Sequence, residues 1–241
     1  MLQNQKDLLQ ALLATGKPVV LVLFTGRPLT LGWEDANIPA ILNVWFGGTE
    51  AGSAIAEVLL GKVNPSGKLT ATFPQSVGQI PIFYNHKNTG RPLAEGQWFT
   101  KFRSNYLDVS NEPLYPFGYG LSYTQFTYGD LKVSSSKLKG NQKLTASVTL
   151  TNSGSFDGAE VVQLYIRDMV GTVTRPVKEL KGFQKIFLKK GESRTVTFNI
   201  TPDDLKFYNS KLKYDWEAGD FTIMIGGNSR DVKSAQVNWI K

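Results

Sequence analysis

Cysteine is absent from this sequence of 241 residues, and histidine occurs once, at His86. The missing thiols exclude a disulfide scaffold, a thiolate metal site and a cysteine nucleophile. A single histidine excludes a multi-histidine metal site and leaves only one possible partner for a Ser-His-Asp arrangement. We therefore expect no metal and no cofactor.

Long apolar runs are also absent. The longest, Pro18 to Phe24, is much shorter than the roughly 18–20 residues that cross a bilayer. The first seven residues lack the basic, apolar and small-residue order of a signal peptide. Most of the net charge of +7 lies after residue 120, which raises nucleic acid as a partner. The lysines are spread over strand-like segments, so we interpret them as a solvated surface and expect neither nucleic acid nor membrane as a partner.

The first third of the sequence is typical of an α/β fold. Leucines at helical spacing predict a helix near residues 2–13. The continuous apolar segments 19–24 and 40–46 are typical of strands buried on both faces of a parallel sheet. Alternation over residues 68–73, after a turn, predicts a third strand.

A glycine-rich loop, Gly47-Gly48-Thr49-Glu50-Ala51-Gly52, follows the second strand and opens a helix predicted to end near Leu60. Loops of this kind can hold a phosphate. This one lacks the Gly-Lys-Ser/Thr signature, and Glu50 would repel a phosphate. We interpret it as a tight turn, with Thr49 as the helix cap and the apolar residues of the helix facing inward.

Residues 74–120 lose periodicity but are rich in aromatics, so we expect an ordered, packed connector rather than a flexible linker. Glycoside hydrolysis requires two carboxyl groups roughly 5–10 Å apart. Asp108 and Glu112 are the more interesting pair, whereas Glu34 and Asp35 are expected in a solvated turn. Glu95 is a further carboxylate of this region.

Three other side chains of the connector are candidates for contact with a substrate. His86 could donate or accept a hydrogen bond, and Trp98 could stack on a sugar face. Arg91 lies between them in the sequence. The candidate substrate-binding residues are therefore His86, Arg91, Trp98 and Asp108. For each of them, a structural role is the simpler alternative.

From Leu121 onward, short segments with alternating apolar residues are separated by turn signals, as in residues 144–150 and 221–225. This pattern predicts a two-sheet, immunoglobulin-like sandwich. Trp216 and Trp239 look exposed. Together with the positive charge, they leave open a non-catalytic module that binds a carbohydrate or a protein.

Several segments together carry a resemblance to a known family. They are Trp45-Phe46-Gly47-Gly48-Thr49-Glu50-Ala51-Gly52, Asn64-Pro65-Ser66-Gly67-Lys68-Leu69, Thr89-Gly90-Arg91-Pro92, Leu114-Tyr115-Pro116-Phe117-Gly118-Tyr119-Gly120-Leu121-Ser122-Tyr123-Thr124 and Arg175-Pro176-Val177-Lys178-Glu179-Leu180-Lys181-Gly182-Phe183. The chain resembles the C-terminal region of family 3 glycoside hydrolases, and within that family bacterial periplasmic β-glucosidases. The resemblance covers essentially the whole sequence.

The resemblance implies an enzyme of three parts, a barrel, an α/β sandwich and a fibronectin type III-like domain, that hydrolyses β-glucosides with retention of configuration. It implies an aspartate nucleophile on the barrel and a glutamate acid/base on a loop of the α/β sandwich. Neither catalytic residue has a counterpart in this sequence. The implied location is periplasmic or secreted.

We therefore predict a C-terminal fragment of a β-glucosidase. Residues 1–80 would be the C-terminal part of the α/β sandwich, residues 81–120 an aromatic-rich connector, and residues 121–241 a fibronectin type III-like domain. The fragment would act as scaffold and pocket wall, with a β-glucoside or oligosaccharide and the barrel as its partners in the full enzyme. Alone it would be inactive, and its exposed sheet edge would favour self-association.

Overall fold

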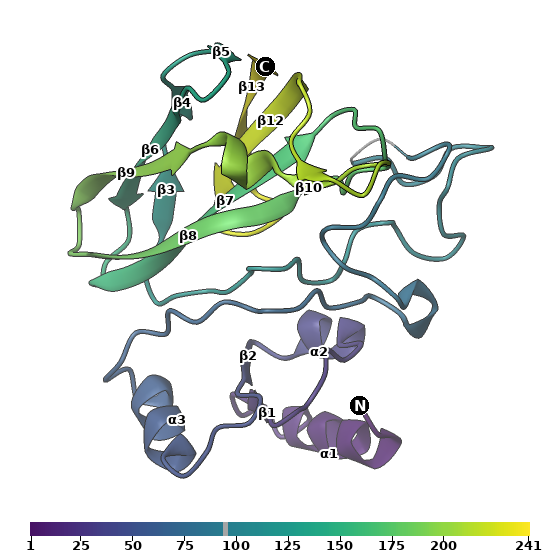
Figure 1. The fold of residues 1–241 in the computed structure, drawn as a ribbon. Coiled ribbons are helices and arrows are strands. Elements are labelled where there is room, and N and C mark those ends of the chain that lie inside the picture. The colour runs from purple at the N-terminus through teal and green to yellow at the C-terminus, as the bar shows by residue number, and fades with distance from the viewer. Residues whose placement is uncertain (94–95) are drawn as a thin grey trace.

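The two continuous apolar segments of the first third form a parallel pair of strands. In the computed structural model, which describes residues 1–93 and 96–241, β1 (Val20–Leu23) pairs along its whole length with β2 (Ala40–Asn43). α1 (Gln3–Leu13) precedes β1, and α3 (Ala51–Leu59) follows β2. The crossover contains a helix of six residues that the sequence did not predict, α2 (Gly32–Asn37). Figure 1 shows these elements together at the base of the molecule.

The prediction of a third strand is wrong. Residues 68–73 form no strand and contribute only an isolated bridge between Phe73 and Tyr115. The backbone of this segment is paired with the connector instead: Leu69 N donates to Tyr119 O at 2.7 Å, and Phe73 N donates to Tyr115 O at 2.9 Å. Because its backbone groups are satisfied there, the segment does not extend the sheet.

The core of the α/β portion is small. Its fully buried members are Leu23, Leu31 and Phe73. None of the residues Ala51–Leu59 of α3 is fully buried, so the expectation of an inward-facing apolar side holds only in part. Thr49 is not the helix cap; Glu50 holds that position, and it makes no side-chain cap hydrogen bond.

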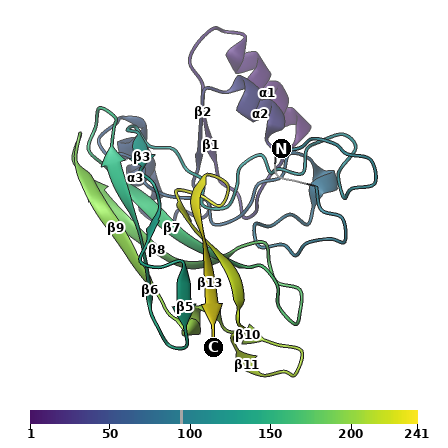
Figure 2. The ribbon, with the colours of Figure 1, turned by 90° about the horizontal axis from the view of Figure 1, so that it is seen from above.

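The second half forms two packed β-sheets, which confirms the predicted fold class of an α/β region followed by a β-sandwich. One sheet has the order β5-β13-β12-β7-β8, and the other has the order β3-β6-β4, with β9 paired to β6. Their bounds are β3 (Phe126–Tyr128), β4 (Lys132–Val133), β5 (Lys137–Lys139), β6 (Leu144–Asn152), β7 (Gly158–Asp168), β8 (Glu179–Leu188), β9 (Ser193–Ile200), β12 (Gly219–Gly226) and β13 (Val232–Ile240). A short hairpin, β10 (Phe207–Tyr208) with β11 (Tyr214–Asp215), lies at the far end from the α/β portion (Figure 2).

The alternating apolar residues of these strands form the sandwich core. Leu144, Leu150, Ile223 and Ile225 are all completely buried. Trp216 and Trp239 belong to the same core and contact each other edge to face, with ring centroids 6.1 Å apart. The expectation that these two tryptophans are exposed is therefore wrong. Both fill space between the sheets.

A short 3-10 helix, η1 (Val77–Gln79), precedes the connector, and the described residues 81–93 and 96–120 run as irregular chain against both parts (Figure 1). Across the described residues, no helix is long and apolar enough to cross a membrane.

Candidate functional site

A buried glutamine holds the loop that carries Asp108 and Glu112. The Gln79 side chain is fully buried, and its Nε2 donates to Ser110 O at 2.9 Å and to Glu112 O at 3.1 Å. Gln75 Nε2 donates to the same Glu112 oxygen at 2.6 Å, and Gln75 N donates to Gln79 Oε1 at 2.6 Å. These side chains replace a sheet as partners of the loop backbone, so the loop is held in place without regular structure.

The two carboxylates on this loop differ in exposure. Asp108 is exposed and Glu112 is half-buried. Within the described part of the chain, neither carboxylate takes part in a hydrogen bond or an ion pair. Glu95 lies outside the described residues.

Tyr84 anchors the beginning of the connector to the sandwich. Its ring stacks on Phe117 with centroids 4.3 Å apart and meets the edge of Tyr165 at 5.8 Å. Its hydroxyl accepts a hydrogen bond from Leu180 N at 3.3 Å. The backbone next to it is fixed as well, because Val177 N donates to His86 O at 2.9 Å.

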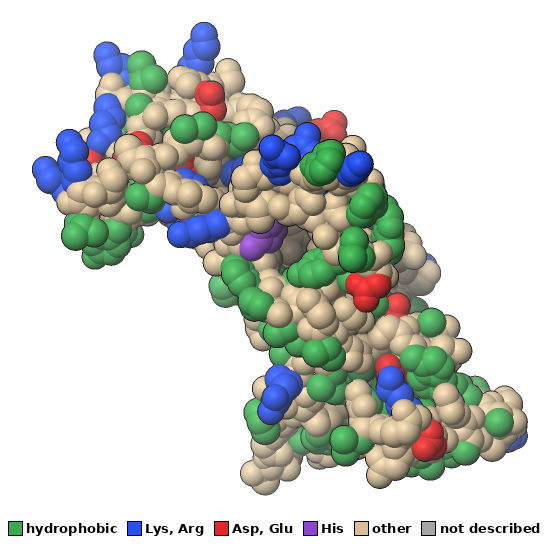
Figure 3. All heavy atoms as spheres, turned by 90° about the vertical axis from the view of Figure 1, so that its right-hand side faces the viewer, with side chains coloured by type: hydrophobic (Ala, Val, Ile, Leu, Met, Phe, Trp, Pro, Cys, Tyr) green, Lys and Arg blue, Asp and Glu red, His purple; other side chains and the backbone are tan. Residues whose placement is uncertain are grey.

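His86 itself is exposed, and its Nδ1 lies 3.2 Å from Lys87 O. Figure 3 shows the histidine side chain in purple at the edge of a hollow in the middle of this face. It is therefore available to a ligand, and its backbone is held by the sandwich.

Arg91 and Trp98 lie on an exposed loop closed at its base by a hydrogen bond from Ser104 N to Arg91 O, at 2.9 Å. Arg91 is exposed, and 54% of the Trp98 surface is accessible. Among the described residues, no hydrogen bond, ion pair or ring contact joins any two of His86, Arg91, Trp98 and Asp108. All four stay candidates for substrate contact.

The turn at Asn64-Pro65-Ser66-Gly67-Lys68 joins the α/β portion to the sandwich, a role that the sequence analysis missed. Asn64 Nδ2 donates to Asp157 O at 2.9 Å, and Asn64 Oδ1 accepts from Ser122 Oγ at 2.8 Å. Lys68 Nζ lies 2.9 Å from Glu160 Oε2 and donates to Gly120 O at 2.9 Å.

Glu160 receives a second donor from the sandwich. Tyr128 Oη donates to Glu160 Oε1 at 3.0 Å, and burial raises the pKa of the Tyr128 hydroxyl well above its usual range. In the sequence, the contact between the α/β portion and the sandwich was indicated only by Lys68, which follows Gly67 of the turn. The partner that makes Lys68 important lies on β7, about 90 residues later in the sequence.

The carboxylates of α2 lie on a helix and not in the expected turn; Glu34 is buried, whereas Asp35 is exposed as expected. Glu34 is completely buried, with Lys6 Nζ 3.9 Å from its Oε1. Asp35 accepts a hydrogen bond from Tyr115 Oη at 2.6 Å, and burial together with that bond raises the pKa of the tyrosine. Both carboxylates are placed by the unpredicted helix, which turns them towards α1 and the connector.

No cluster suited to a metal ion is found among residues 1–93 and 96–241. At the glycine-rich loop, a Cβ on Gly47 would lie 2.5 Å from the Ala51 Cβ. The loop therefore packs as the tight turn that the sequence suggested.

Two known domains match the sequence. The glycosyl hydrolase family 3 C-terminal domain matches residues 1–123, and the fibronectin type III-like domain matches residues 160–229. The first match covers the α/β portion and the connector. The second lies within the sandwich.

Curated relatives are much longer than this chain. The periplasmic beta-glucosidase of Salmonella typhimurium is 55% identical over 231 residues, which are 96% of this chain and 30% of that protein. A beta-xylosidase of Formosa agariphila is 44% identical over 97% of this chain and 31% of its own length. The chain thus spans less than a third of the length of these two relatives.

The fold agrees with solved structures over both parts. A beta-glucosidase from Listeria innocua has a TM-score of 0.92 and 43% identity, and the match covers 99% of this chain and 33% of that enzyme. Structures of that enzyme in complex with glucose, and of a mutant in complex with laminaribiose, each have a TM-score of 0.90. The domain match over residues 1–123 and the shared two-part fold lead to one conclusion: this chain belongs to glycosyl hydrolase family 3.

Proposed function

We propose that this chain is the C-terminal portion of a retaining β-glucosidase that removes terminal β-D-glucosyl residues. In this role residues 1–80 belong to the α/β sandwich, residues 81–120 form the connector, and residues 121–241 form the fibronectin type III-like domain. The Salmonella relative supports a periplasmic or secreted location. The Listeria complexes support a glucoside or glucose-containing oligosaccharide as substrate.

The proposed role is scaffold and pocket wall. The observation that carries it is the connector, whose exposed candidates stand on a backbone pinned by buried Gln79 on one side and by Tyr84 on the other. Binding sites require side chains held in place by such supporting contacts. An arginine, an indole and a histidine that face solvent on the connector are suited to recognising a sugar at the rim of a pocket.

Both catalytic carboxylates of the retaining mechanism are assigned to other parts of the full enzyme. One carboxylate attacks the anomeric carbon and the other protonates the leaving oxygen, so both must flank the scissile bond. Asp108 and Glu112 fulfil neither role in this proposal. A separate carbohydrate-binding function of the sandwich depended on exposed Trp216 and Trp239. Because both side chains are buried, they do not support that function.

The proposal is tested by joining the preceding two thirds of the Salmonella relative in frame to residues 1–241. We expect the fusion to hydrolyse an aryl β-glucoside, and the chain alone to give only the buffer rate. Turnover by the chain alone that is abolished in Asp108→Asn or Glu112→Gln would contradict the assignment.

Within the active fusion, Arg91→Ala tests the pocket wall. Loss of a charged hydrogen bond to the substrate should raise KM by about tenfold, with the melting temperature unchanged. Lys101→Ala, on the same exposed loop, is the matched control and should leave KM unchanged. An Arg91→Ala fusion with the parental KM removes Arg91 from the candidates.

A further inference from the structure

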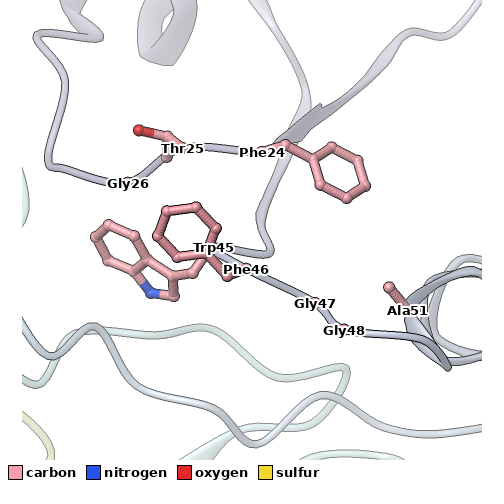
Figure 4. A pocket seen from close by; sticks show the side chains of 8 residues that line it. All are labelled: Phe24, Thr25, Gly26, Trp45, Phe46, Gly47, Gly48 and Ala51. Atoms are coloured by element: carbon pink, nitrogen blue, oxygen red, sulfur yellow. The ribbon is translucent and has the colours of Figure 1, made fainter.

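The depression at the ends of β1 and β2, about 340 Å³ in volume, is lined by aromatic and small residues (Figure 4). The described residues that line it are Phe24, Thr25, Gly26, Trp45, Phe46, Gly47, Gly48 and Ala51. None of these side chains is charged, Phe46 is 86% exposed, and the Thr25 hydroxyl already donates to Arg27 O at 2.6 Å. Ligand sites depend on a few well-placed polar groups, so these residues offer little that would orient a sugar. The connector, by contrast, offers the imidazole of His86.

His86 depends on its backbone for its position. Its side chain is exposed. Among the described residues, the only hydrogen bond of the ring is the contact of 3.2 Å between Nδ1 and the carbonyl oxygen of the neighbouring Lys87. A bond to the next residue does not fix the ring relative to the rest of the molecule. The place of the imidazole therefore follows from where the backbone of residues 86 and 87 is held.

The loop that joins β7 to β8 holds this part of the backbone. Val177 N donates to His86 O at 2.9 Å, and Pro176 forms an isolated antiparallel bridge with Lys87. Two consecutive residues of the loop thus contact two consecutive residues of the connector. A movement of the loop would carry the histidine with it.

Arg175, the residue directly before this pair, fixes the loop to the sandwich. Its Nη2 donates to Glu179 Oε2 at 2.7 Å, at the start of β8, and its Nε lies 3.5 Å from Asp168 Oδ2, at the end of β7. The guanidinium carbon also lies 4.0 Å from the ring centroid of Phe207 on β10. Only 12% of the arginine side chain is accessible. One planar cation therefore connects both ends of the loop with the neighbouring hairpin.

The outer part of the loop is held as well. A Cβ on Gly171 would lie 3.0 Å from Arg175 Cγ, so the chain passes close to the stem of the arginine. Thr172 N donates to Glu217 Oε2 at 2.8 Å. A buried ion pair is by itself weak evidence for stability, whereas a side chain that contacts a ligand requires a supporting shell of fixed geometry. The contacts of Arg175 form such a shell behind His86.

We propose that Arg175 is a positioning residue for sugar recognition, which holds the β7–β8 loop in the arrangement that presents the His86 imidazole to a glucoside. The inference rests on the proposed function, which makes His86 a candidate for substrate contact. It also gives the sandwich a task, because the sandwich then positions a residue of the pocket wall. Lysine cannot replace the arginine, since an ammonium group lacks the planar fork that meets two carboxylates and an aromatic ring at once.

Nuclear magnetic resonance of the chain alone tests the positioning directly. His86 is the only histidine of the sequence, so its carbon-bound ring protons give a single set of resonances. We expect Arg175→Lys to move these resonances by more than their linewidth, because the backbone that carries the ring shifts. Arg194→Lys is the matched control and should leave them in place. Arg194 also pairs with a glutamate, Glu192 at 2.9 Å, but lies on β9 with 51% of its side chain accessible.

Ile223→Ala controls for a general loss of stability. It removes a completely buried side chain of the sandwich core, so it should lower the melting temperature without moving the His86 resonances. If Ile223→Ala moved the resonances as far as Arg175→Lys, destabilisation alone would account for the effect. That result would overturn the positioning role.

A double-mutant cycle in the fusion described above tests whether Arg175 acts through His86. We expect Arg175→Lys to raise KM about fivefold with kcat unchanged, as for an interaction made equally in the ground state and the transition state. In a His86→Ala background the same change should leave KM unaltered, because the contact is already lost. An equal rise of KM in both backgrounds would show that Arg175 does not act through His86.

The outcomes distinguish this role from the proposed function. A parental KM for His86→Ala, or unmoved resonances in Arg175→Lys, overturns the positioning role and leaves the assignment of an active fusion standing. An inactive parental fusion contradicts the proposed function instead. Moved resonances in Arg175→Lys would in that case still place the imidazole under the control of the arginine.

Discussion

At the scale of single residues, Lys68 is the charge that joins the two parts of the molecule. Its ammonium group and the Glu160 carboxylate are both largely buried, with 13% and 6% of their side chains accessible. A buried ion pair has a large desolvation cost, so its presence alone is weak evidence for stability. Removing one partner is different, because it leaves the other charge buried without compensation.

We predict that Lys68→Met lowers the free energy of unfolding by about 3–5 kcal/mol, as expected for an uncompensated buried carboxylate. Urea denaturation followed by intrinsic fluorescence measures the change. Lys241→Met breaks an exposed ion pair with Asp215 and should have little effect. Adding Glu160→Gln to Lys68→Met should recover part of the loss. Equal effects of the two lysine variants would contradict the prediction.

Asp168 shows how burial acts on one carboxyl group. Burial raises the pKa of Asp168 above the ordinary 3.8, against the opposing effect of Arg175, whose Nε lies 3.5 Å away. In the folded state the proton is therefore held to a higher pH than in the unfolded state. The stability that this group contributes is present below about pH 3.8 and declines as the pH rises through the raised value.

We predict that Asp168→Asn gains stability relative to the parent chain as the pH rises from 3 towards neutrality. Asp215→Asn is the control with the opposite pH dependence. In the parent chain, the hydrogen bond between Asp215 and Lys241 holds the pKa of Asp215 below 3.8. That variant should lose stability relative to the parent over the same range, since stability from a lowered pKa appears as the carboxylate ionises. The urea midpoints of the two variants and the parent chain, measured at several pH values, give these stability differences. If both differences changed with pH in the same direction, the prediction would be contradicted.

At the scale of elements, the connector depends on side-chain partners in place of a sheet. Gln79 is completely buried, and its Nε2 donates to the backbone oxygens of Ser110 and Glu112. Leucine at this position would have a similar size and no donor. Two partly buried carbonyl groups would then lose a donor, and Glu112 O would keep only Gln75 Nε2.

We predict that Gln79→Leu destabilises the connector by about 1–3 kcal/mol, the cost of leaving buried polar groups unsatisfied. Hydrogen exchange of residues 104–112 should quicken, while exchange in β12 stays unchanged. Gln142→Leu, at an exposed position whose Oε1 accepts from Lys139 N, is the control and should leave residues 104–112 protected. Unchanged exchange in Gln79→Leu would show that other contacts hold the loop.

At the scale of the whole molecule, the two parts have unequal cores. The sandwich buries a large set of residues from both sheets, whereas the core cluster of the α/β portion has three buried members, Leu23, Leu31 and Phe73. Stability follows buried apolar area, so the sandwich should persist after the α/β portion opens.

We predict two thermal transitions for the chain alone, the first reported by loss of helical circular dichroism. Ile223→Ala should lower only the second midpoint, because removing a completely buried side chain costs about 2–5 kcal/mol. Ile240→Ala, at a residue that is 48% exposed on the neighbouring strand, should have a much smaller effect. A single cooperative transition for the full length would contradict unequal stability of the two parts.

Local pattern was sufficient for the main strands of the sandwich and for two of the helices. The strands β6, β7, β9 and β12 follow the alternation in the sequence, because each presents one face to the core. α1 and α3 also lie close to where the periodicity of the sequence placed them. The same reasoning failed for residues 68–73, whose alternation matches a strand but whose partners lie in the connector.

The candidate site was predictable only as a set of residue types. Arg91, Trp98 and His86 were identifiable as groups able to contact a sugar, and the structure leaves them exposed. The groups that position the connector, Gln79 and Tyr84, carried no local signal. Their importance comes from partners that are distant in sequence, such as Leu180 for Tyr84.

The sequence by itself determined the fold class, the order of the two parts and the family resemblance, because these follow from periodicity and from contiguous motifs. Only the tertiary structure decided which side chains are buried, as Trp216, Trp239 and Glu34 show. It also decided that Lys68 meets Glu160 and that Phe46 faces outward at the ends of two parallel strands. Burial and pairing depend on contacts between distant segments, and no local pattern carries that information.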